Sequence, residues 1–282
     1  MGGGMDAEML PIDCVSTILS NTSPSDACRS SMVSSTFRSA AESDVVWKRF
    51  LPADYRDLVS RLVTPLTFSA MKELFLLLCN PVLIDGGKKS FKLDKSSGKI
   101  SYMLSARELS ITWSDEPLCW SWRSVPESRF SEVAELRTTS WLEIHGKIRT
   151  QSLSPNTTYG AYLVLKTYDR AYGLDSIPSE ISVSVGNRLF NGTAYLTRGD
   201  HKKQQMECLF YKNRIEMLRK RVGEGDGRVP CKREDGWMEI ELGEFFSGDA
   251  SEEVKMSLME VKGNQLKGGL VIEGIEVRPK EY

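Results

Sequence analysis

Three tryptophans lie close together in the stretch ARELSITWSDEPLCWSW, residues 106–122. Trp113 precedes the residues Ser-Asp-Glu-Pro, a composition typical of a turn, and Trp120 and Trp122 follow it. Large flat rings on both sides of a polar turn either plug the end of a hydrophobic core or are held out for a flat ligand to stack on. The pattern leaves both roles open for Trp113 and Trp120. We expect Trp122 and Trp141 to pack in or against the core, because large aromatic side chains are mostly buried.

Acidic residues form a second candidate group in WMEIEL, residues 237–242. In a strand, a period of two places Trp237, Glu239 and Glu241 on one face and the apolar residues between them on the other. Carboxylates accept hydrogen bonds well from hydroxyl groups, and Glu244 follows in the adjacent turn. The alternative is that these acids are the solvated face of an edge strand.

Catalysis is not expected from these residues. Glu239 and Glu241 would lie roughly 6–7 Å apart on one strand, whereas glycosidase carboxylates must flank the scissile bond. The motifs GxSxG and HExxH and the P-loop are absent, and GEGDG at 223–227 is not a dinucleotide fingerprint. Two histidines, His145 and His201, and six cysteines without a CxxC pair make a zinc site improbable. We therefore expect no enzyme activity, no metal and no cofactor.

Composition narrows the class of protein. The 282 residues carry a net charge of −1, which favours neither a nucleic-acid nor a membrane partner. The longest apolar run, Leu74 to Cys79, is too short to span a bilayer. The N-terminus lacks the features of a secretory signal, so we expect reduced cysteines and a cytoplasmic and nuclear location.

The two halves of the chain differ in their predicted secondary structure. The first 80 residues predict short helices, opened by cap residues such as Asp13 and Asp44, with a later helix over roughly 69–79. Helices this short are unstable alone in water, so the segment must pack on the rest of the chain or on a partner. From Val82 onward the alternation predicts many strands and a β-sandwich. The expected strands span 90–93, 100–104, 141–148, 159–168, 181–185, 237–242, 254–261 and 270–277.

Residues 10–50, LPIDCVSTILSNTSPSDACRSSMVSSTFRSAAESDVVWKRF, resemble the F-box. The resemblance implies docking to a Skp-type adaptor within a cullin-based ubiquitin ligase. Leu10, Pro11, Ile18 and Leu19 would form much of the contact. The rest of the resemblance rests on the stretches VSSTF at 33–37 and VWK at 46–48, in which we expect Phe37 and Trp47 to hold the helices together.

Four ordered blocks in the second half look like the phloem protein 2 family, which is also known from Nictaba-type lectins. The blocks are residues 106–122, 132–148, 235–246 and 268–279. The resemblance implies binding of N-acetylglucosamine oligomers and N-glycan cores, with two sugar-stacking tryptophans that fall on Trp113 and Trp120. Glu239, Glu241 and Glu244 are then candidates for accepting hydrogen bonds from the sugar.

The resulting fold class is α+β: a small all-α F-box of three helices, followed by an antiparallel, jelly-roll-like β-sandwich. The domains are a disordered segment 1–8, the F-box 9–55, a helical connector 56–82, and the lectin-type domain 83–282 with a surface insertion near 201–233.

The expected function is that of a substrate-recognition subunit of a Skp–cullin–F-box ubiquitin ligase that captures glycans or glycoproteins. The alternative is a receptor whose sandwich has lost sugar binding and captures a protein degron. In both cases the ubiquitin chemistry lies in other subunits.

Overall fold

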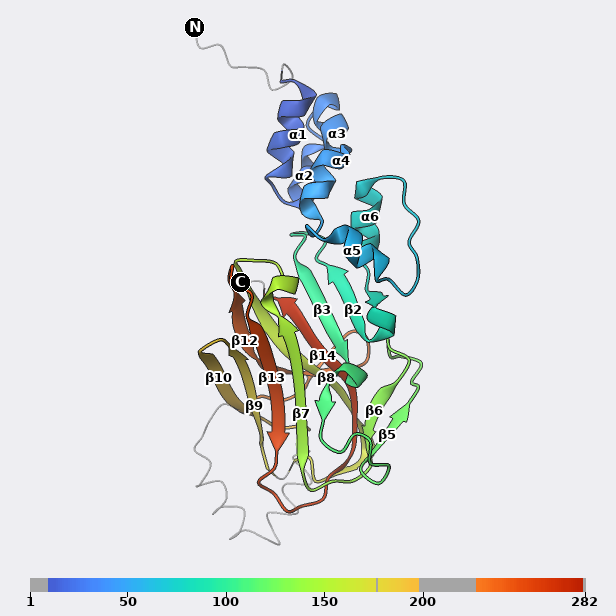
Figure 1. The fold of residues 1–282 in the computed structure, drawn as a ribbon, viewed down its shortest axis with the longest axis vertical. Coiled ribbons are helices and arrows are strands. Elements are labelled where there is room, and N and C mark those ends of the chain that lie inside the picture. Colours follow the sequence, from blue (N-terminus) through green and yellow to red (C-terminus); the bar gives the residue numbers. More distant parts are fainter. Residues whose placement is uncertain (1–9, 176, 198–226, 281–282) are drawn as a thin grey trace. The chain divides into compact units, whose positions relative to one another are not determined.

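The computed structural model describes residues 10–175, 177–197 and 227–280 (Figure 1). The chain divides into two compact units, residues 1–102 and 103–282. The N-terminal unit contains the F-box, the connector and the strands up to Tyr102, which the sequence had suggested as the start of the second domain. The segment 1–8 and most of the insertion expected at 201–233 lie outside the described residues.

Three helices in the N-terminal unit begin at serine caps, whereas the expected openers Asp13 and Asp44 lie inside the first turns of α1 and α4. The side chains of Ser23, Ser34 and Ser43 each accept a hydrogen bond from a backbone N–H in the first turn that follows. The cap at Ser34 separates two helices, so the F-box segment contains four short helices where three were expected. The helices are α1 (Ile12–Ser20), α2 (Pro24–Ser30), α3 (Ser35–Ala41), α4 (Asp44–Phe50), α5 (Tyr55–Ser60) and α6 (Met71–Leu78).

Trp47 is the centre of this unit. Its side chain is buried, as expected, and its indole Nε1 donates to the carbonyl of Ala41 at 2.6 Å. Its ring lies 5.2 Å from that of Phe75 on α6. The backbone N–H of Met71, the first residue of α6, donates to Asp44 Oδ1 on α4 at 2.9 Å. The connector is therefore packed on the F-box helices and forms one body with them.

A hairpin turn completes the N-terminal unit. Strand β1 (Val82–Ile84) pairs with β2 (Lys89–Leu93), and β3 (Ile100–Ser105) begins after the turn at residues 94–98. Gly98 has a φ of +72°, and a Cβ there would lie 3.3 Å from the carbonyl of Phe50. Only glycine combines this backbone conformation with so close an approach. The expected hairpin is thus confirmed, and its turn packs on the helices.

The C-terminal unit contains two antiparallel sheets (Figure 1). One follows the order β14-β8-β12-β11, with β6 pairing with β14 and β5 pairing with β6. The other follows the order β10-β9-β13-β7-β4. The strands are β4 (Ser110–Ile111), β5 (Trp120–Arg123), β6 (Val133–Leu136), β7 (Leu142–Arg149), β8 (Thr157–Tyr172), β9 (Ser179–Val185), β10 (Arg188–Ala194), β11 (Cys231–Lys232), β12 (Met238–Ser247), β13 (Glu253–Glu260) and β14 (Gly268–Pro279).

The two sheets share a core built from alternating residues. Val254, Met256 and Leu258 of β13 are buried, and the residues between them face outward. At Gly146 on β7 an added Cβ would lie 2.9 Å from Ile275 Cδ1 on β14, so the facing sheets are in close contact there. The α+β fold with an antiparallel sandwich is confirmed. Among the described strands the sequence prediction missed six, namely β1, β4, β5, β6, β10 and β11.

Candidate functional site

Trp113 lies in a tight turn at the end of β4, with its ring exposed. The backbone N–H of Ser114 donates to the carbonyl of Ile111 at 3.1 Å and closes the turn. Within this turn Trp113 has a φ of +58°, and its side chain is 51% exposed. A left-handed backbone is unfavourable for a bulky residue, and such strain gathers at functional sites. The fold thus holds a large apolar ring in solvent at a conformational cost.

The other two tryptophans of this stretch support the turn. Trp120 Nε1 donates to the carbonyl of Thr112 at 3.1 Å, and Trp122 Nε1 donates to the carbonyl of Ser114 at 3.1 Å. These carbonyls belong to the residues on either side of Trp113. We call this arrangement, Trp120 and Trp122 on β5 holding the backbone around Trp113, the tryptophan clamp.

Trp113 and Trp120, for which the sequence left the same two roles open, differ in exposure. Trp120 is 3% exposed, so its ring face is not available for stacking in this conformation. Trp122 is half-buried, and the Arg107 guanidinium carbon lies 3.6 Å from the centre of its ring. Of the predicted stacking pair, only Trp113 is exposed at the surface. Trp120 is buried and holds the turn through its hydrogen bond to the carbonyl of Thr112.

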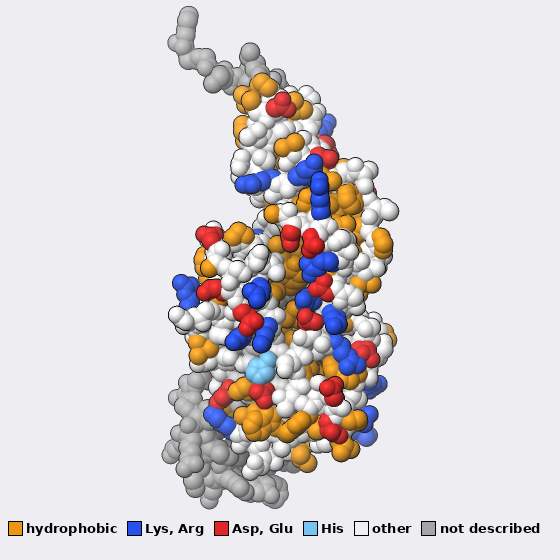
Figure 2. Space-filling view, viewed as in Figure 1, with side chains coloured by type: hydrophobic (Ala, Val, Ile, Leu, Met, Phe, Trp, Pro, Cys, Tyr) orange, Lys and Arg blue, Asp and Glu red, His pale blue; other side chains and the backbone are white. Residues whose placement is uncertain are grey.

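Trp141 lies beside this turn, and the expectation that it packs in the core is wrong. It is 42% exposed, and its indole Nε1 donates to Glu143 Oε2 at 2.9 Å. A sequence signal was present: Leu142 and Ile144 point into the core, so period two turns Trp141 and Glu143 outward. Leu118 and Leu266 are also exposed, and Figure 2 shows hydrophobic side chains gathered at the lower end of β7.

The predicted acids lie in a different place. Glu239, Glu241 and Glu244 are on β12, in the sheet that does not contain β4. Strand β12 faces β9 and β10, while β4 is the opposite edge of that second sheet. Strands spaced at about 4.8 Å put several strand widths between the two groups. The structure therefore does not bring these acids together with Trp113.

Basic partners already occupy the acids. Arg278 contacts both oxygens of Glu239, at 2.6 and 2.8 Å, and Arg233 contacts Glu239 Oε2 at 2.5 Å. Burial would raise the pKa of Glu239, but these two guanidinium groups outweigh it and hold the pKa below its ordinary value. Lys280 pairs with both Glu241 and Glu244. Their role in sugar binding stays a prediction, and any ligand there would compete with ion pairs.

Trp237, expected on the same face as these acids, is buried. Its Nε1 donates to the carbonyl of Glu127 at 3.2 Å, and Lys166 Nζ lies 4.4 Å from its ring centre. It is a core residue of the unit.

The predicted adaptor surface is mostly exposed. Leu10, Pro11 and Ile18 are exposed, with Ile18 51% exposed, whereas Leu19 is 2% exposed and packs among the helices. Further exposed apolar side chains on the same four-helix segment, not assigned to the adaptor from the sequence, are Ile12, Met32, Val33 and Val45.

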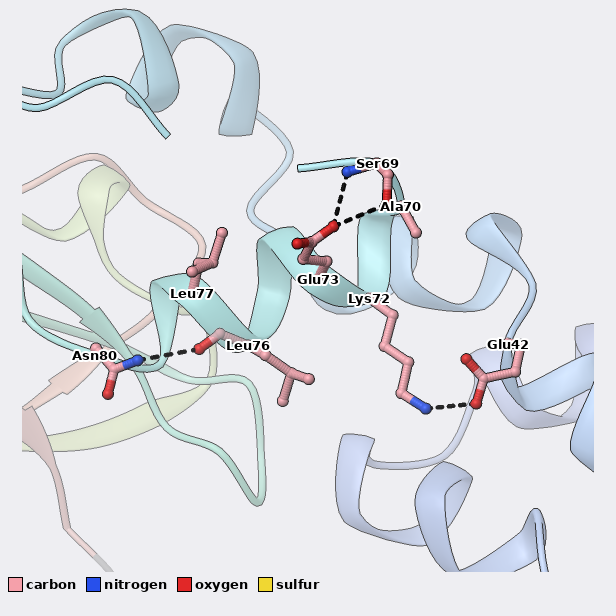
Figure 3. A pocket seen from close by; sticks show the side chains of 8 residues that line it. All are labelled: Glu42, Ser69, Ala70, Lys72, Glu73, Leu76, Leu77 and Asn80. Carbon is pink, nitrogen blue, oxygen red and sulfur yellow. Dashed lines mark hydrogen bonds and ion pairs between the residues drawn. The ribbon is translucent and has the colours of Figure 1, made fainter. Parts of the chain in front are cut away.

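A hollow of about 470 Å³ lies along α6 in the N-terminal unit (Figure 3). Lys72 Nζ contacts Glu42 Oε1 at 2.6 Å across it, and Glu73 accepts hydrogen bonds from Ser69 at 2.8 and 2.9 Å. Lys72 and Glu42 thus pair with each other and Glu73 is bound by Ser69, and the hollow contains none of the predicted site residues. Across the described ranges no three His, Cys, Asp or Glu side chains are grouped to hold a metal ion. In the same ranges no helix is long and apolar enough to cross a membrane.

Comparison with known proteins agrees with both halves of the structure. The F-box domain matches residues 8–49, and Phloem protein 2 matches residues 99–279. F-box protein PP2-B15 of Arabidopsis thaliana is 56% identical over 280 residues, covering 96% of each chain. F-box protein PP2-B13 of the same plant is 55% identical over 278 residues, covering 96% of this chain and 98% of its own. F-box protein VBF, also from Arabidopsis thaliana, is 53% identical over 279 residues, covering 96% and 99%. The four short helices and the two-sheet unit with its exposed tryptophan thus belong to an F-box protein of the phloem protein 2 family.

Proposed function

We propose that this protein is a substrate receptor of a Skp–cullin–F-box ubiquitin ligase, and that its C-terminal unit binds N-acetylglucosamine-containing glycans or glycoproteins. The observation that carries the glycan part is the exposed ring of Trp113, held in a left-handed turn by the tryptophan clamp. The protein itself acts as a non-catalytic adaptor in the cytoplasm and nucleus.

Adaptor docking is supported by the apolar surface of α1 to α4. Ile18 and the nearby apolar side chains are exposed on helices too short to be stable without packing. Exposed apolar patches of this kind mark protein interaction surfaces, and a partner helix in a shallow groove is a common solution. The occupant we propose is a Skp-type adaptor.

A matched pair of substitutions on α1 tests this docking. Ile18→Asp places a charge on the exposed face, and we expect it to weaken adaptor binding by at least about thirtyfold with little change in the melting temperature. Leu19→Asp, one residue along, places the charge in the helical core and should unfold the unit. Adaptor binding is measured by calorimetry on the full chain. Unchanged binding by a folded Ile18→Asp variant would remove the docking proposal.

Glycan binding is supported by the chemistry of the exposed ring. A pyranose has a face lined with C–H bonds, and an indole laid on it provides a large apolar contact at little cost in side-chain entropy. The clamp fixes the backbone that carries the ring before a ligand arrives, which reduces the cost of binding further. Thr112 and Glu143, half-exposed beside Trp113, are polar groups at its edge.

A glycan array with the full chain tests this part, with Trp113→Ala and Glu239→Gln run beside the wild type. We expect wild type and Glu239→Gln to bind N-acetylglucosamine-containing glycans and a folded Trp113→Ala to lose them. Loss with Glu239→Gln alone would move the site to β12. Absence of wild-type binding would reject glycan recognition.

The second candidate is a receptor for a protein degron, and one observation favours it. Trp120 is buried, while Leu118, which lies between Trp113 and Trp120 in the chain, is exposed, and this makes the surface more apolar than a sugar requires. Such a receptor would bind its target protein equally well with and without glycans.

A further inference from the structure

Trp141 is exposed, and hydrogen bonds hold both its ring and its backbone. Its indole Nε1 donates to Glu143 at 2.9 Å. Its backbone N–H donates to Thr139 Oγ1 at 3.0 Å, and that hydroxyl donates back to the Trp141 carbonyl at 2.9 Å. Both the ring and the backbone are thus fixed without a ligand.

Glu143 links this ring to the turn that carries Trp113. Its Oε2 also accepts from Thr112 Oγ1 at 3.1 Å, and His145 Nε2 lies 2.8 Å from its Oε1. The hydrogen bond from Trp141, and then that from His145, lowers the pKa of Glu143, so the carboxylate is charged at neutral pH. One charged group therefore holds Trp141 and the residue that precedes Trp113.

The chain segments that carry the two exposed tryptophans adjoin at the β4–β7 pair. Ile111 pairs with Ile144, and the backbone N–H of Thr112 donates to the carbonyl of Glu143 at 3.1 Å. The register ends at Ile111, because Trp113 lies in the turn that follows. The two exposed rings therefore belong to adjoining chain segments that Glu143 joins through Thr112 and Trp141.

A buried ion pair anchors the segment beneath Trp141. Lys267 is 1% exposed and pairs with Glu260, which is 4% exposed. Lys267 Nζ also donates to the carbonyl of Ser140 at 2.7 Å, and its backbone exchanges two hydrogen bonds with Thr139, at 2.8 and 3.0 Å. A buried ion pair is weak evidence for added stability, and in some proteins such a pair serves to fix one geometry; we infer that role for this pair. Here that geometry is the position of residues 139–141.

We propose that Trp141 is a second ligand-stacking side chain, which takes the sugar ring next to the one on Trp113, and that Glu143 and the Lys267–Glu260 pair position it. This inference rests on the proposed glycan function. Because the Trp141 N–H is already bound to Glu143, its contribution is the ring face, so the ligand gains apolar contact there and not a hydrogen bond.

Calorimetric titration of the full chain with N-acetylglucosamine and its β-linked dimer and trimer tests the proposal. Wild-type affinity should rise with length. Trp141→Ala should lower trimer affinity about tenfold, the effect of losing one stacking contact, and should leave affinity for the single sugar unchanged. The trimer affinity of Trp141→Phe should lie between those of the wild type and Trp141→Ala. Glu143→Gln should lower trimer affinity because the Trp141 ring is then held less firmly. Leu189→Ala, an exposed apolar residue on β10 at the opposite edge of the sheet, is the control.

The outcomes separate the two proposals. If the wild type binds no sugar of any length, the glycan function fails and this inference fails with it. If the wild type binds the trimer and both folded Trp141 variants bind it equally well, Trp141 is not a ligand contact and only this inference is overturned.

Discussion

The left-handed backbone conformation of Trp113 marks this residue as part of a candidate binding site. Its left-handed conformation costs roughly 1–2 kcal/mol for a residue with a Cβ, and its exposed ring recovers only part of the usual benefit of burial. A residue kept for stability would be placed otherwise. The conformation is better explained by the need to present the ring.

This strain predicts an unusual order of stability for two truncations of Trp113. Both remove the ring, but glycine adopts a positive φ freely, so Trp113→Gly should be more stable than Trp113→Ala by about 1 kcal/mol. Urea denaturation of the two variants measures the difference. In regular secondary structure alanine is the more stable, and that order here would show that the turn relaxes and stores no strain.

Sequence patterns placed Trp113 correctly beside a turn but misjudged its neighbours. Periodicity tells which side of a strand a residue occupies, and it left Trp120 undecided because β5 is short and begins with it. The deciding fact is a hydrogen bond from its indole to Thr112, which comes from the packing of two consecutive strands that belong to different sheets. The acids on β12 are half-buried, and Trp237, expected on their face, is buried. The cations that pair with the acids come mainly from β14 and the chain beside β11 and β14, which a period of two does not predict.

At the scale of elements, the tryptophan clamp makes β5 a support for the turn after β4. The indole N–H groups of Trp120 and Trp122 each satisfy a backbone carbonyl that the turn leaves without a strand partner. The turn is therefore held from one side by hydrogen bonds and needs no contact with a ligand to keep its shape.

Replacing a clamp tryptophan by phenylalanine removes the donor and keeps most of the ring. We expect Trp120→Phe to cost about 1–3 kcal/mol of stability and to weaken sugar binding, although the residue does not touch the ligand. Trp237→Phe is the control, because it loses a similar indole hydrogen bond, to Glu127, far from the turn. Thermal melts and sugar titrations are compared. An equal loss of affinity in both variants would mean that the clamp has no specific role.

Strand β14 carries a buried acid, Glu273, whose titration should be visible in stability. It is 1% exposed, and burial raises its pKa, against the opposing hydrogen bond from the Arg129 backbone. Its Oε1 accepts from Ser128 and Arg129, Asp235 adds a further negative charge nearby, and its Oε2 has no partner. The neutral form is thus the one that the fold favours.

The sign of the effect follows from linkage. Stability from the neutral form is fully present below the ordinary glutamate pKa, about 4.3, and is lost as the pH rises through the raised pKa of Glu273. Glu273→Gln keeps the accepting oxygen and cannot ionise. The melting temperature of the variant minus that of the wild type should therefore increase as the pH rises from 4, and then stay constant. Melting curves across this range measure it. A constant difference at all pH values would show that Glu273 does not titrate in the fold.

For the whole molecule, the two units correspond to the two parts of the proposed receptor function. The N-terminal unit joins the F-box helices and connector through Trp47, Phe75 and the Asp44 cap of α6, and its apolar surface suits an adaptor. The C-terminal unit presents Trp113 and Trp141 at the edge of a sandwich. Texture and motifs were enough to predict this division from the sequence. The boundary differed, because the strands up to Tyr102 pack with the helices through contacts such as Gly98 on Phe50, which no local pattern encodes.

The most direct test of the account is ubiquitin transfer by the reconstituted ligase, with this protein as receptor, to one N-glycosylated protein before and after enzymatic removal of its glycans. The account predicts transfer to the glycosylated form, little transfer to the stripped form, and loss of the difference when a folded Trp113→Ala receptor is used. Equal transfer to both forms by the wild-type receptor would contradict glycan recognition and identify the C-terminal unit as a reader of protein surface.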